Sequence, residues 1–337
     1  MNRILSTLSQ KWPEYLIESI VIVASILGAY ALDNWNEQRQ KEEKLQALFE
    51  KVKNDLAYDL SRLDIGIQYN KQNFLVADSI LDRTFSWKSK PSGLLNPRGS
   101  NLGISVLTFS KDSYTELMKI SETIPKEYYP LINQLNRVFN VYPLRTGSAI
   151  GNNGELQSLY LQIIGKLDWH DQLVSGADLN QLAINYYEND PEFRTIYRKY
   201  HDVLLTYIID CYVVAGYNTY LIDEISGITG IPFDWSTLLP AVERSNSEND
   251  MEQYTGTFIR RDSQDTIRIR LENGYPLVVR RINNFNATLY YQSQGQDTLT
   301  SYPNISSLIF HRDSTGSVSN LTTDFLKFTN EFQKVLE

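Results

Sequence analysis

The sequence predicts an α+β protein with four parts. These are an N-terminal transmembrane helix that continues as a long stalk helix, an α-helical bundle domain, a small antiparallel β-domain, and a terminal helix. Three observations predict this order: one apolar run near the N-terminus, apolar residues at intervals of three and four through the middle, and an interval of two beyond residue 253. The predicted boundaries are 1–14 for a flank, 15–35 for the anchor, 36–244 for the helical domain with its stalk, 245–252 for a linker, and 253–337 for the β-domain with its terminal helix.

Composition excludes several classes of function. A chain of 337 residues is long enough for about two domains. Its net charge of -8 argues against a nucleic-acid partner, because phosphate binding needs a dense basic face. The single cysteine, Cys211, excludes an internal disulfide and a metal site built from cysteines alone.

The apolar run at residues 15–32 predicts a membrane anchor. A spanning helix needs about 20 mostly apolar residues. The run holds one acid, Glu18, near one end, where a charge costs less than at the bilayer centre. Two alternatives stay open. The small-x-small sequence that ends at Ala31 is typical of a signal-peptidase site, and an apolar run of this length also suits a buried soluble helix.

The residues around this run form a recognisable pattern. An acid (Glu18) precedes an apolar run that contains Gly28, and a polar motif leads into a charged helix; the motif residues are Asn34, Trp35, Asn36 and Glu37. Over residues 13–65 the chain therefore resembles an uncharacterised bacterial membrane-anchored family, domain of unknown function 6090. Asp33 stands where that pattern has a further polar residue such as Asn. The resemblance implies a membrane protein with no established activity.

Helical patterns fill the region after the anchor. Residues 38–67 predict one amphipathic helix, because apolar residues recur at intervals of three and four. A second helix is expected at 72–83 and a loop at 86–103, where Pro, Gly, Ser and Asn are frequent. Further helices are expected at 110–121, 128–142, 155–167 and 178–187, with a turn at the glycine-rich residues 146–154.

The strongest helix signal begins at Asp190 and Pro191, an N-cap residue followed by proline, and extends to Gly227. Its apolar residues alternate at four and three, which is a heptad seam. Asn218 is a polar residue on that seam and can fix the register of packing. The seam suits either the central helix of an intramolecular bundle or a surface through which copies of the chain associate.

The β-domain is predicted from residue alternation. Residues 266–272 alternate apolar and charged side chains, so one face is buried and the other exposes Arg268 and Arg270. Asn273-Gly274 then predicts a tight hairpin. Other strands are expected at 254–260, 277–282, 287–293, 298–302, 307–312 and 317–321. The phenylalanines in 322–336 recur at three and four residues and predict the terminal helix.

Tyr254-x-Gly256-x-Phe258, the hairpin, and Arg312-Asp313-x-x-Gly316 make this module similar to the accessory β-domain of serine-hydrolase, penicillin-binding-protein-like proteins. That resemblance implies an accessory role and no catalytic residue. Since such domains are exported, we expect a single-pass protein of the bacterial inner membrane with its soluble part in the periplasm. Basic residues lie on both sides of the anchor, so the cytoplasm stays as the alternative.

Signals for chemistry are sparse. The sequence lacks the Ser-x-x-Lys, Gly-x-Ser-x-Gly, Gly-x-x-x-x-Gly-Lys and His-Glu-x-x-His motifs. Histidine stands beside aspartate at His170 and at His201, which leaves a membrane-tethered metal-dependent hydrolase as an alternative function. The exposed Arg268 and Arg270 suit either a solvated face or recognition of an anionic ligand.

We therefore expect a non-enzymatic, single-pass membrane protein that acts as an interaction or ligand-binding unit and needs no cofactor. Its expected partners are the lipid bilayer and, through Glu18, another membrane protein, because acids in a span usually face protein or water. A structural homo-oligomer built on the stalk helix is a further alternative.

Overall fold

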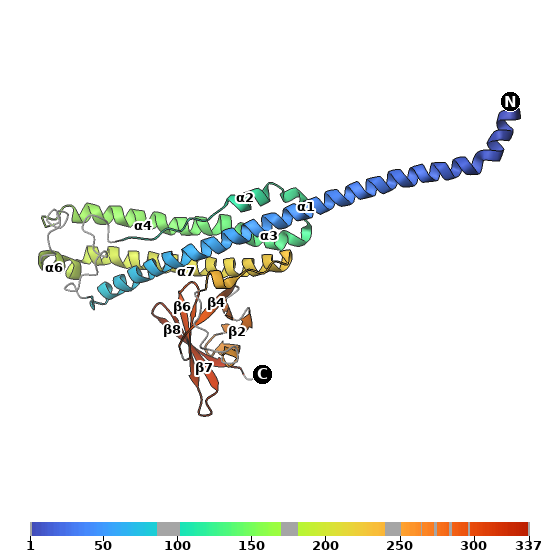
Figure 1. Cartoon of the computed structure of the whole chain (residues 1–337). Coiled ribbons are helices and arrows are strands. Elements are labelled where there is room, and N and C mark those ends of the chain that lie inside the picture. Colours follow the sequence, from blue (N-terminus) through green and yellow to red (C-terminus); the bar gives the residue numbers. More distant parts are fainter. Residues whose placement is uncertain are drawn as a thin grey trace.

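A rod of long helices carries a β-barrel on one side, and a single helix extends from one end of the rod (Figure 1). The computed structural model describes residues 2–85, 102–169, 181–239, 251–263, 265–272, 275–282, 285–295 and 297–335. The helices are α1 (Asn2–Leu81), α2 (Asp112–Met118), α3 (Tyr129–Asn136), α4 (Tyr142–Ile164), α6 (Gln181–Asn189) and α7 (Pro191–Thr229). Short turns of 3₁₀ helix are η1 (Ser121–Thr123), η2 (Lys126–Tyr128) and η4 (Trp235–Thr237), and η3 (Arg137–Val141) is a π-helical turn between α3 and α4.

Helix α1 is continuous, so the expected separation into helices at 38–67 and 72–83 is wrong. Its first buried apolar residue is Leu45, and from there a buried face runs through Phe49, Val52 and Leu56. Asn70, at the expected break, is buried inside the helix. Its side-chain amide donates to the carbonyl of Ser105 (3.1 Å) and its oxygen accepts from the Ser105 amide (2.9 Å). These bonds to a neighbouring segment satisfy the polar side chain without ending the helix.

Helix α7 confirms the strongest helix prediction. The Asp190 side chain caps it by accepting from the amide of Phe193 (2.8 Å), and Gly230 ends it in the left-handed conformation (φ 69°). Every residue of the predicted seam is buried; these are Phe193, Tyr197, Tyr200, Leu204, Tyr207, Cys211, Val214, Asn218, Leu221 and Ile225. Because α7 packs against both α1 and α4, it is the central helix of the helical region.

The expected turn at 146–154 is wrong, because α4 runs through it. The buried face of α4 includes Thr146, Ala149 and Asn153, and the Asn153 amide donates to the carbonyl of Leu102 (2.8 Å). The glycines of this stretch lie on the exposed face. Packing of one face thus outweighs the weak helix propensity of glycine, about 1 kcal/mol per residue.

The buried carboxyl group of Asp59 makes the stability of the fold depend on pH. Both of its oxygens accept the amide of Ser110 (3.1 Å each). Burial raises the pKa of Asp59 from 3.8 to about 7, against the lowering effect of the Ser110 bond. The folded chain therefore holds this proton more tightly than the unfolded chain, and the contribution of Asp59 to stability falls as pH rises from about 4 to 7.

The variant Asp59→Asn keeps an acceptor for Ser110 and removes the charge. We expect the variant to raise the free energy of unfolding by about 1–3 kcal/mol at pH 8. At pH 4, where Asp59 is protonated in the folded chain, we expect the variant and the unmodified chain to have nearly the same free energy of unfolding. Urea titrations at the two pH values measure this, with the exposed Glu122→Gln as control. If Asp59→Asn instead lowers the free energy of unfolding at pH 8, the fold stabilises the charged carboxylate of Asp59, and the prediction is contradicted.

The C-terminal strands form a closed antiparallel barrel in which each strand pairs with the next and β8 pairs with β1. The strands are β1 (Gly256–Arg260), β2 (Thr266–Glu272), β3 (Tyr275–Ile282), β4 (Phe285–Gly295), β5 (Thr298–Ser301), β6 (Ser306–Arg312), β7 (Val318–Phe325) and β8 (Phe328–Lys334). Every predicted strand is present. The residues of the predicted hairpin turn, 273–274, lie outside the described residues, but the pairing of Glu272 with Tyr275 confirms the hairpin.

The terminal helix predicted at 322–336 is wrong, because this segment supplies the end of β7 and the whole of β8. Leu326 takes a positive φ of 58° at the turn between the two strands, and Phe325 pairs with Phe328. Phe332 lies in the core, and β8 pairs on its other side with β1. This segment forms a strand because its backbone hydrogen bonds to β7 and β1 close the barrel. The spacing of the phenylalanines carries no information about this pairing.

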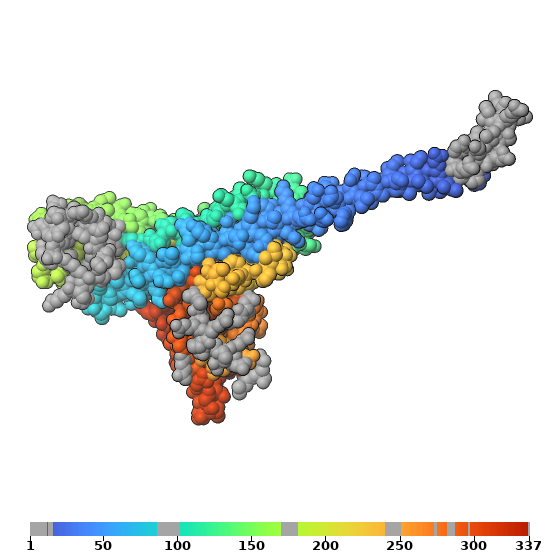
Figure 2. Space-filling view, in the orientation of Figure 1, coloured from blue at the N-terminus to red at the C-terminus, as the bar shows by residue number. Residues whose placement is uncertain are grey.

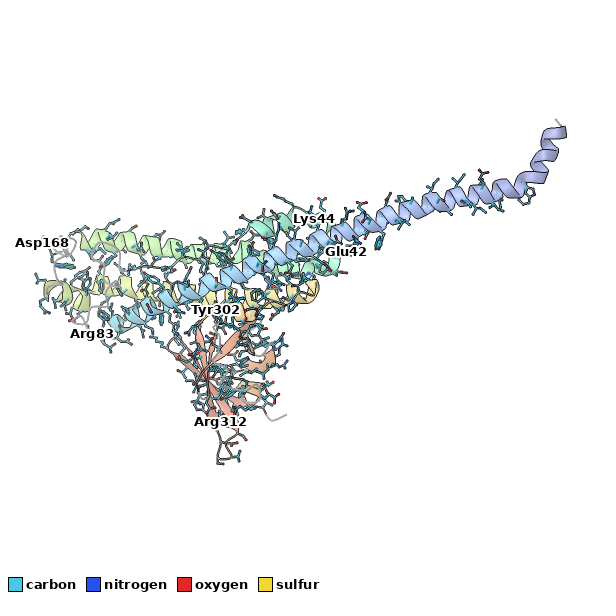
Figure 3. The ribbon with its side chains drawn as sticks, in the orientation of Figure 1. Glu42, Lys44, Arg83, Asp168, Tyr302 and Arg312 are labelled. Carbon is cyan, nitrogen blue, oxygen red and sulfur yellow. The ribbon has the colours of Figure 1, made fainter. Side chains whose placement is uncertain are left out.

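The barrel rests against α1 and α7. On α1, Asp64 accepts the amide of Asn304 (3.0 Å), and Asp78 pairs with Lys327. Tyr302, next to Asn304, lies where the barrel meets the helices, and Arg312 lies toward the opposite end of the barrel (Figure 3). The barrel is therefore held by contacts with helices that precede it by many residues in the chain.

On α7 the backbones come close. A Cβ atom at Gly216 would lie 3.3 Å from both the Ala287 Cα and the Thr288 amide nitrogen of β4. Beyond the end of α7, the Trp235 ring packs against the Tyr290 ring at a tilt of 48°, with centroids 4.3 Å apart. Glycine at position 216 thus allows the barrel to approach the helix.

Candidate functional site

The clearest functional feature is the free N-terminal part of α1. The segment from Leu16 is long and apolar enough to cross a membrane, with a mean hydropathy of 1.8 over its most apolar window and none of that window buried. Side chains from Leu16 to Lys44 are exposed, and Figure 2 shows the helix leaving the rest of the protein with no other element against it. Large exposed apolar patches are uncommon on soluble monomers and mark binding or membrane surfaces.

Of the predicted anchor residues, Glu18 and Gly28 lie within this free segment, and a Cβ atom at Gly28 would meet nothing within 4 Å. Asn34, Trp35 and Asn36 follow on the same exposed helix. The arrangement brings these residues into one continuous helix, and no other described element packs against them.

Charged residues begin where the apolar segment ends. The guanidinium of Arg39 lies 5.5 Å from the centre of the Trp35 ring and pairs with Glu43 (3.2 Å). Glu37 pairs with Lys41 (2.7 Å), and the hydrogen bond from Lys41 lowers the pKa of Glu37. Glu42 and Lys44 lie further along this exposed stretch (Figure 3). An aromatic and cationic border of this kind suits the interface between a bilayer and water.

Arg268 and Arg270 lie on the outer surface of β2, as predicted, while Ile267 and Ile269 point into the barrel. Arg270 pairs with Glu272 (2.8 Å). The strand therefore presents both arginines to solvent.

Asn218 does not lie on an interaction surface, because it is buried between α7 and α1. Its amide donates to the carbonyl of Leu56 (3.3 Å). A heptad seam in a sequence cannot tell a helix packed within its own chain from one packed against another copy, and here α1 covers the seam. Asn218 thus takes part in the register of α7 on α1.

His201 is a half-buried side chain within the helical region. Its ring stacks on Phe74, with centroids 4.3 Å apart, and its nitrogens lie 3.3 Å from Asp78 and 3.5 Å from Asp202. His170, the other histidine of the proposed metal pair, lies outside the described residues. Among the described residues, no group of three His, Cys, Asp or Glu side chains is placed to hold a metal ion.

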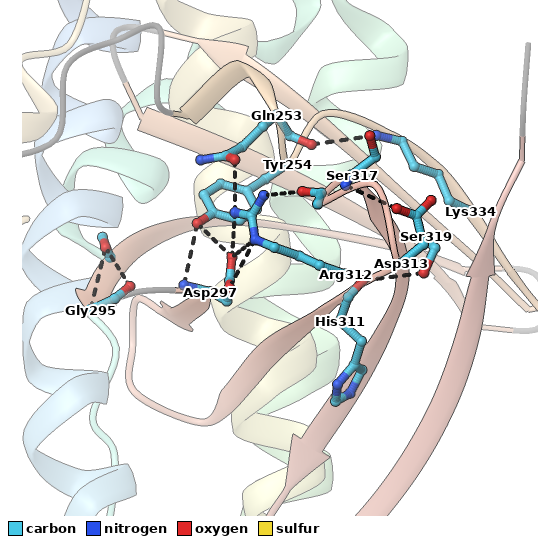
Figure 4. A network of polar contacts seen from close by, with 12 residues as sticks. Gln253, Tyr254, Gly295, Asp297, His311, Arg312, Asp313, Ser317, Ser319 and Lys334 are labelled. Carbon is cyan, nitrogen blue, oxygen red and sulfur yellow. Dashed lines mark hydrogen bonds and ion pairs between the residues drawn. The ribbon is translucent and has the colours of Figure 1, made fainter.

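Tyr254 and Arg312, two of the residues that carried the resemblance to an accessory β-domain, take part in a polar clamp at one end of the barrel (Figure 4). The Arg312 Nε donates to both oxygens of Asp297 (3.1 Å each), and its other nitrogens donate to Gly316 O and Gln253 Oε1 (2.7 Å each). The Tyr254 hydroxyl also donates to Asp297 (3.1 Å). The Arg312 bond holds the pKa of Asp297 below its usual value. These residues tie three chain segments together, which is a structural role.

The sequence did not reveal the residues that join the barrel to the helices. Asp223 on α7 accepts from the Trp235 indole (3.1 Å) and from the Tyr290 hydroxyl (3.4 Å to its nearer oxygen). Burial raises the pKa of Asp223 to about 6. These partners come from three separate segments, so no motif in the sequence connects them.

Residues 18–91 match the family described as Family of unknown function (DUF6090). The match covers the free segment of α1 from Glu18 onward, its charged border and its packed half, and it leaves out α2 to α7 and the barrel. No curated protein and no solved structure matches the chain. The chain is therefore similar to a family of unknown function over its N-terminal region.

Proposed function

We propose that this chain is a single-pass membrane protein that holds a non-enzymatic interaction or ligand-binding unit beside the bilayer. The exposed apolar segment of α1 carries the proposal. Its 15–32 stretch spans about 27 Å at 1.5 Å per residue, close to the roughly 30 Å of a bilayer core. The segment does not stabilise the rest of the fold by packing, because none of the other described residues packs against it.

The stalk sets the distance between membrane and protein. Residues 33–44 are exposed and helical, so they separate the apolar segment from the packed part of α1 by about 18 Å. Because α1 is one uninterrupted helix, the stalk is a stiff spacer. Such a spacer suits a protein that presents a surface at a fixed height above lipid headgroups.

The resemblance of the sequence motifs in residues 254–318 to exported accessory domains supports a periplasmic position for the helical region and barrel. A fusion of alkaline phosphatase after residue 337 tests the side of the membrane, since this enzyme becomes active only after export. We expect an active fusion. A fluorescent-protein fusion that matures in the cytoplasm, paired with an inactive phosphatase fusion, would contradict the periplasmic position.

Glu18 is the point at which we propose contact with a second membrane protein. An acid in a span is costly unless it meets protein or water. Crosslinking of the intact chain in membranes, compared with Glu18→Leu, tests this contact. We expect the variant to insert and to lose a crosslinked partner; an unchanged set of partners would remove Glu18 from the contact.

A further inference from the structure

A cleft of about 690 Å³ lies between the helical region and the outer wall of the barrel. Its volume falls in the range of small-molecule sites, about 300–1,000 Å³. Helix α7 lines most of one side, together with Arg137 of η3, and Arg270, Val279 and Thr288 of the barrel line the other. The cleft is thus built from segments that meet only in the folded protein.

Two glycines of α7 shape this space. At Gly216 the backbones of α7 and β4 touch, which brings the two walls together. At Gly227, three turns along α7, a Cβ atom would meet nothing within 4 Å. The walls therefore meet at Gly216 and stand apart near Gly227.

Cationic groups reach the cleft from both walls. The Arg137 guanidinium donates to the Tyr217 hydroxyl (3.3 Å) and has no ion pair among the described residues. Arg270 comes from the barrel side, and its side chain is 58% exposed beside Glu272. An anionic group in the cleft would give Arg137 the charged partner that the described residues do not provide.

Acceptors also line the cleft. Asp223 and Glu224 are neighbours on α7, and the side-chain oxygen of Gln134 is buried without a hydrogen-bond partner among the described residues. Leaving a buried acceptor unpaired is unfavourable, so a donor that reaches the Gln134 oxygen is favoured. Burial raises the pKa of Asp223 to about 6, which leaves its carboxylate charged at neutral pH.

We propose that the cleft binds a small zwitterion, such as an amino acid or a short peptide, whose carboxylate meets Arg137 and Arg270 and whose ammonium group meets Asp223, Glu224 and the Gln134 oxygen. A purely anionic ligand would face two carboxylates, and a purely cationic ligand would face two arginines. Only a ligand that carries both charges is complementary to the whole lining. This site is independent of the membrane anchor.

Calorimetric titration of the full-length chain in detergent tests the ligand class. The probes are the twenty free amino acids and the dipeptides that each forms with a C-terminal alanine. The strongest binder is then compared with its N-acetylated form, which lacks the ammonium group, and its C-terminal amide, which lacks the carboxylate. We expect each modified probe to bind at least tenfold more weakly.

Three arginine variants locate the site. Arg137→Ala and Arg270→Ala are each expected to weaken binding of the strongest probe at least tenfold. Arg268→Ala is the matched control, because Arg268 is exposed on the same face of β2, two residues from Arg270, and does not line the cleft. We expect it to bind as the unmodified chain does.

The proposal is overturned if no probe binds, or if the acetylated and amidated probes bind as well as the parent compound. It is also overturned if Arg268→Ala weakens binding as much as Arg270→Ala. The chemically modified probes need no variant, so the first comparison stands even if an arginine variant fails to fold.

Discussion

Replacing both Val23 and Leu27 by lysine is expected to abolish membrane insertion. The two side chains lie one turn apart near the middle of the apolar segment and are 54% and 62% exposed. A lysine at the centre of a spanning helix costs about 2.5–3.5 kcal/mol, so two cost about 5–7 kcal/mol. Because no described residue packs against this segment, the helical region and barrel should fold as before.

Protease protection in sealed membrane vesicles measures the effect. A chain that fails to insert stays on the cytoplasmic side, where it is synthesised. We therefore expect protease on that side to digest the double variant completely. The matched control places lysines at Ile65 and Leu144, which are also exposed apolar residues on helices but lie outside the segment. The control should insert normally; insertion of the Val23 and Leu27 variant at the level of the control would refute a spanning role.

Replacing Gly216 by leucine is expected to separate the barrel from α7. A Cβ atom at this position is already 3.3 Å from two backbone atoms of β4, and backbone cannot move aside as a side chain can. Overpacking of a close contact costs about 1–3 kcal/mol. The contacts at risk are the neighbouring ones, including the bonds of Asp223 to Trp235 and Tyr290.

The control for this change is Gly227→Leu. Both glycines lie in α7, so both variants gain helix propensity, but a side chain at 227 enters open space. We expect Gly216→Leu to lower the free energy of unfolding by about 1–3 kcal/mol and Gly227→Leu to leave it unchanged or higher. Equal stability of the two variants would show that the barrel does not depend on this approach.

Much of the fold follows from local patterns in the sequence. Helix α7 was predicted with both ends, because its cap at Asp190 and its uninterrupted seam each depend on neighbouring residues. Strands β1 to β7 were predicted because alternation and turn residues are local too, as in β2 with its hairpin. The anchor was predicted as an apolar run, and the structure places that run on an exposed helix.

The wrong predictions of secondary structure lie where contacts between residues far apart in the chain determine the conformation. β8 was taken for a helix, because the spacing of Phe325, Phe328 and Phe332 fits a helix, while the pairing of β8 with β1 joins residues more than 70 positions apart. A break in the helix was predicted between residues 67 and 72. It does not occur, because Asn70 forms hydrogen bonds to Ser105 and stays within the helix. The interdomain cleft escaped prediction for the same reason, since Arg137 and Arg270 share no local motif.

The proposed anchor requires residues 15–32 to lie in a bilayer and to tether everything that follows. Carbonate extraction of membranes separates a spanning helix from a peripheral one, when the full chain is compared with a chain that begins at residue 36. We predict that the full chain stays with the membrane pellet, with an intact N-terminus, while the shortened chain is released. A full-length chain in the supernatant, or a mature protein that begins at Leu32, would contradict the proposed anchor.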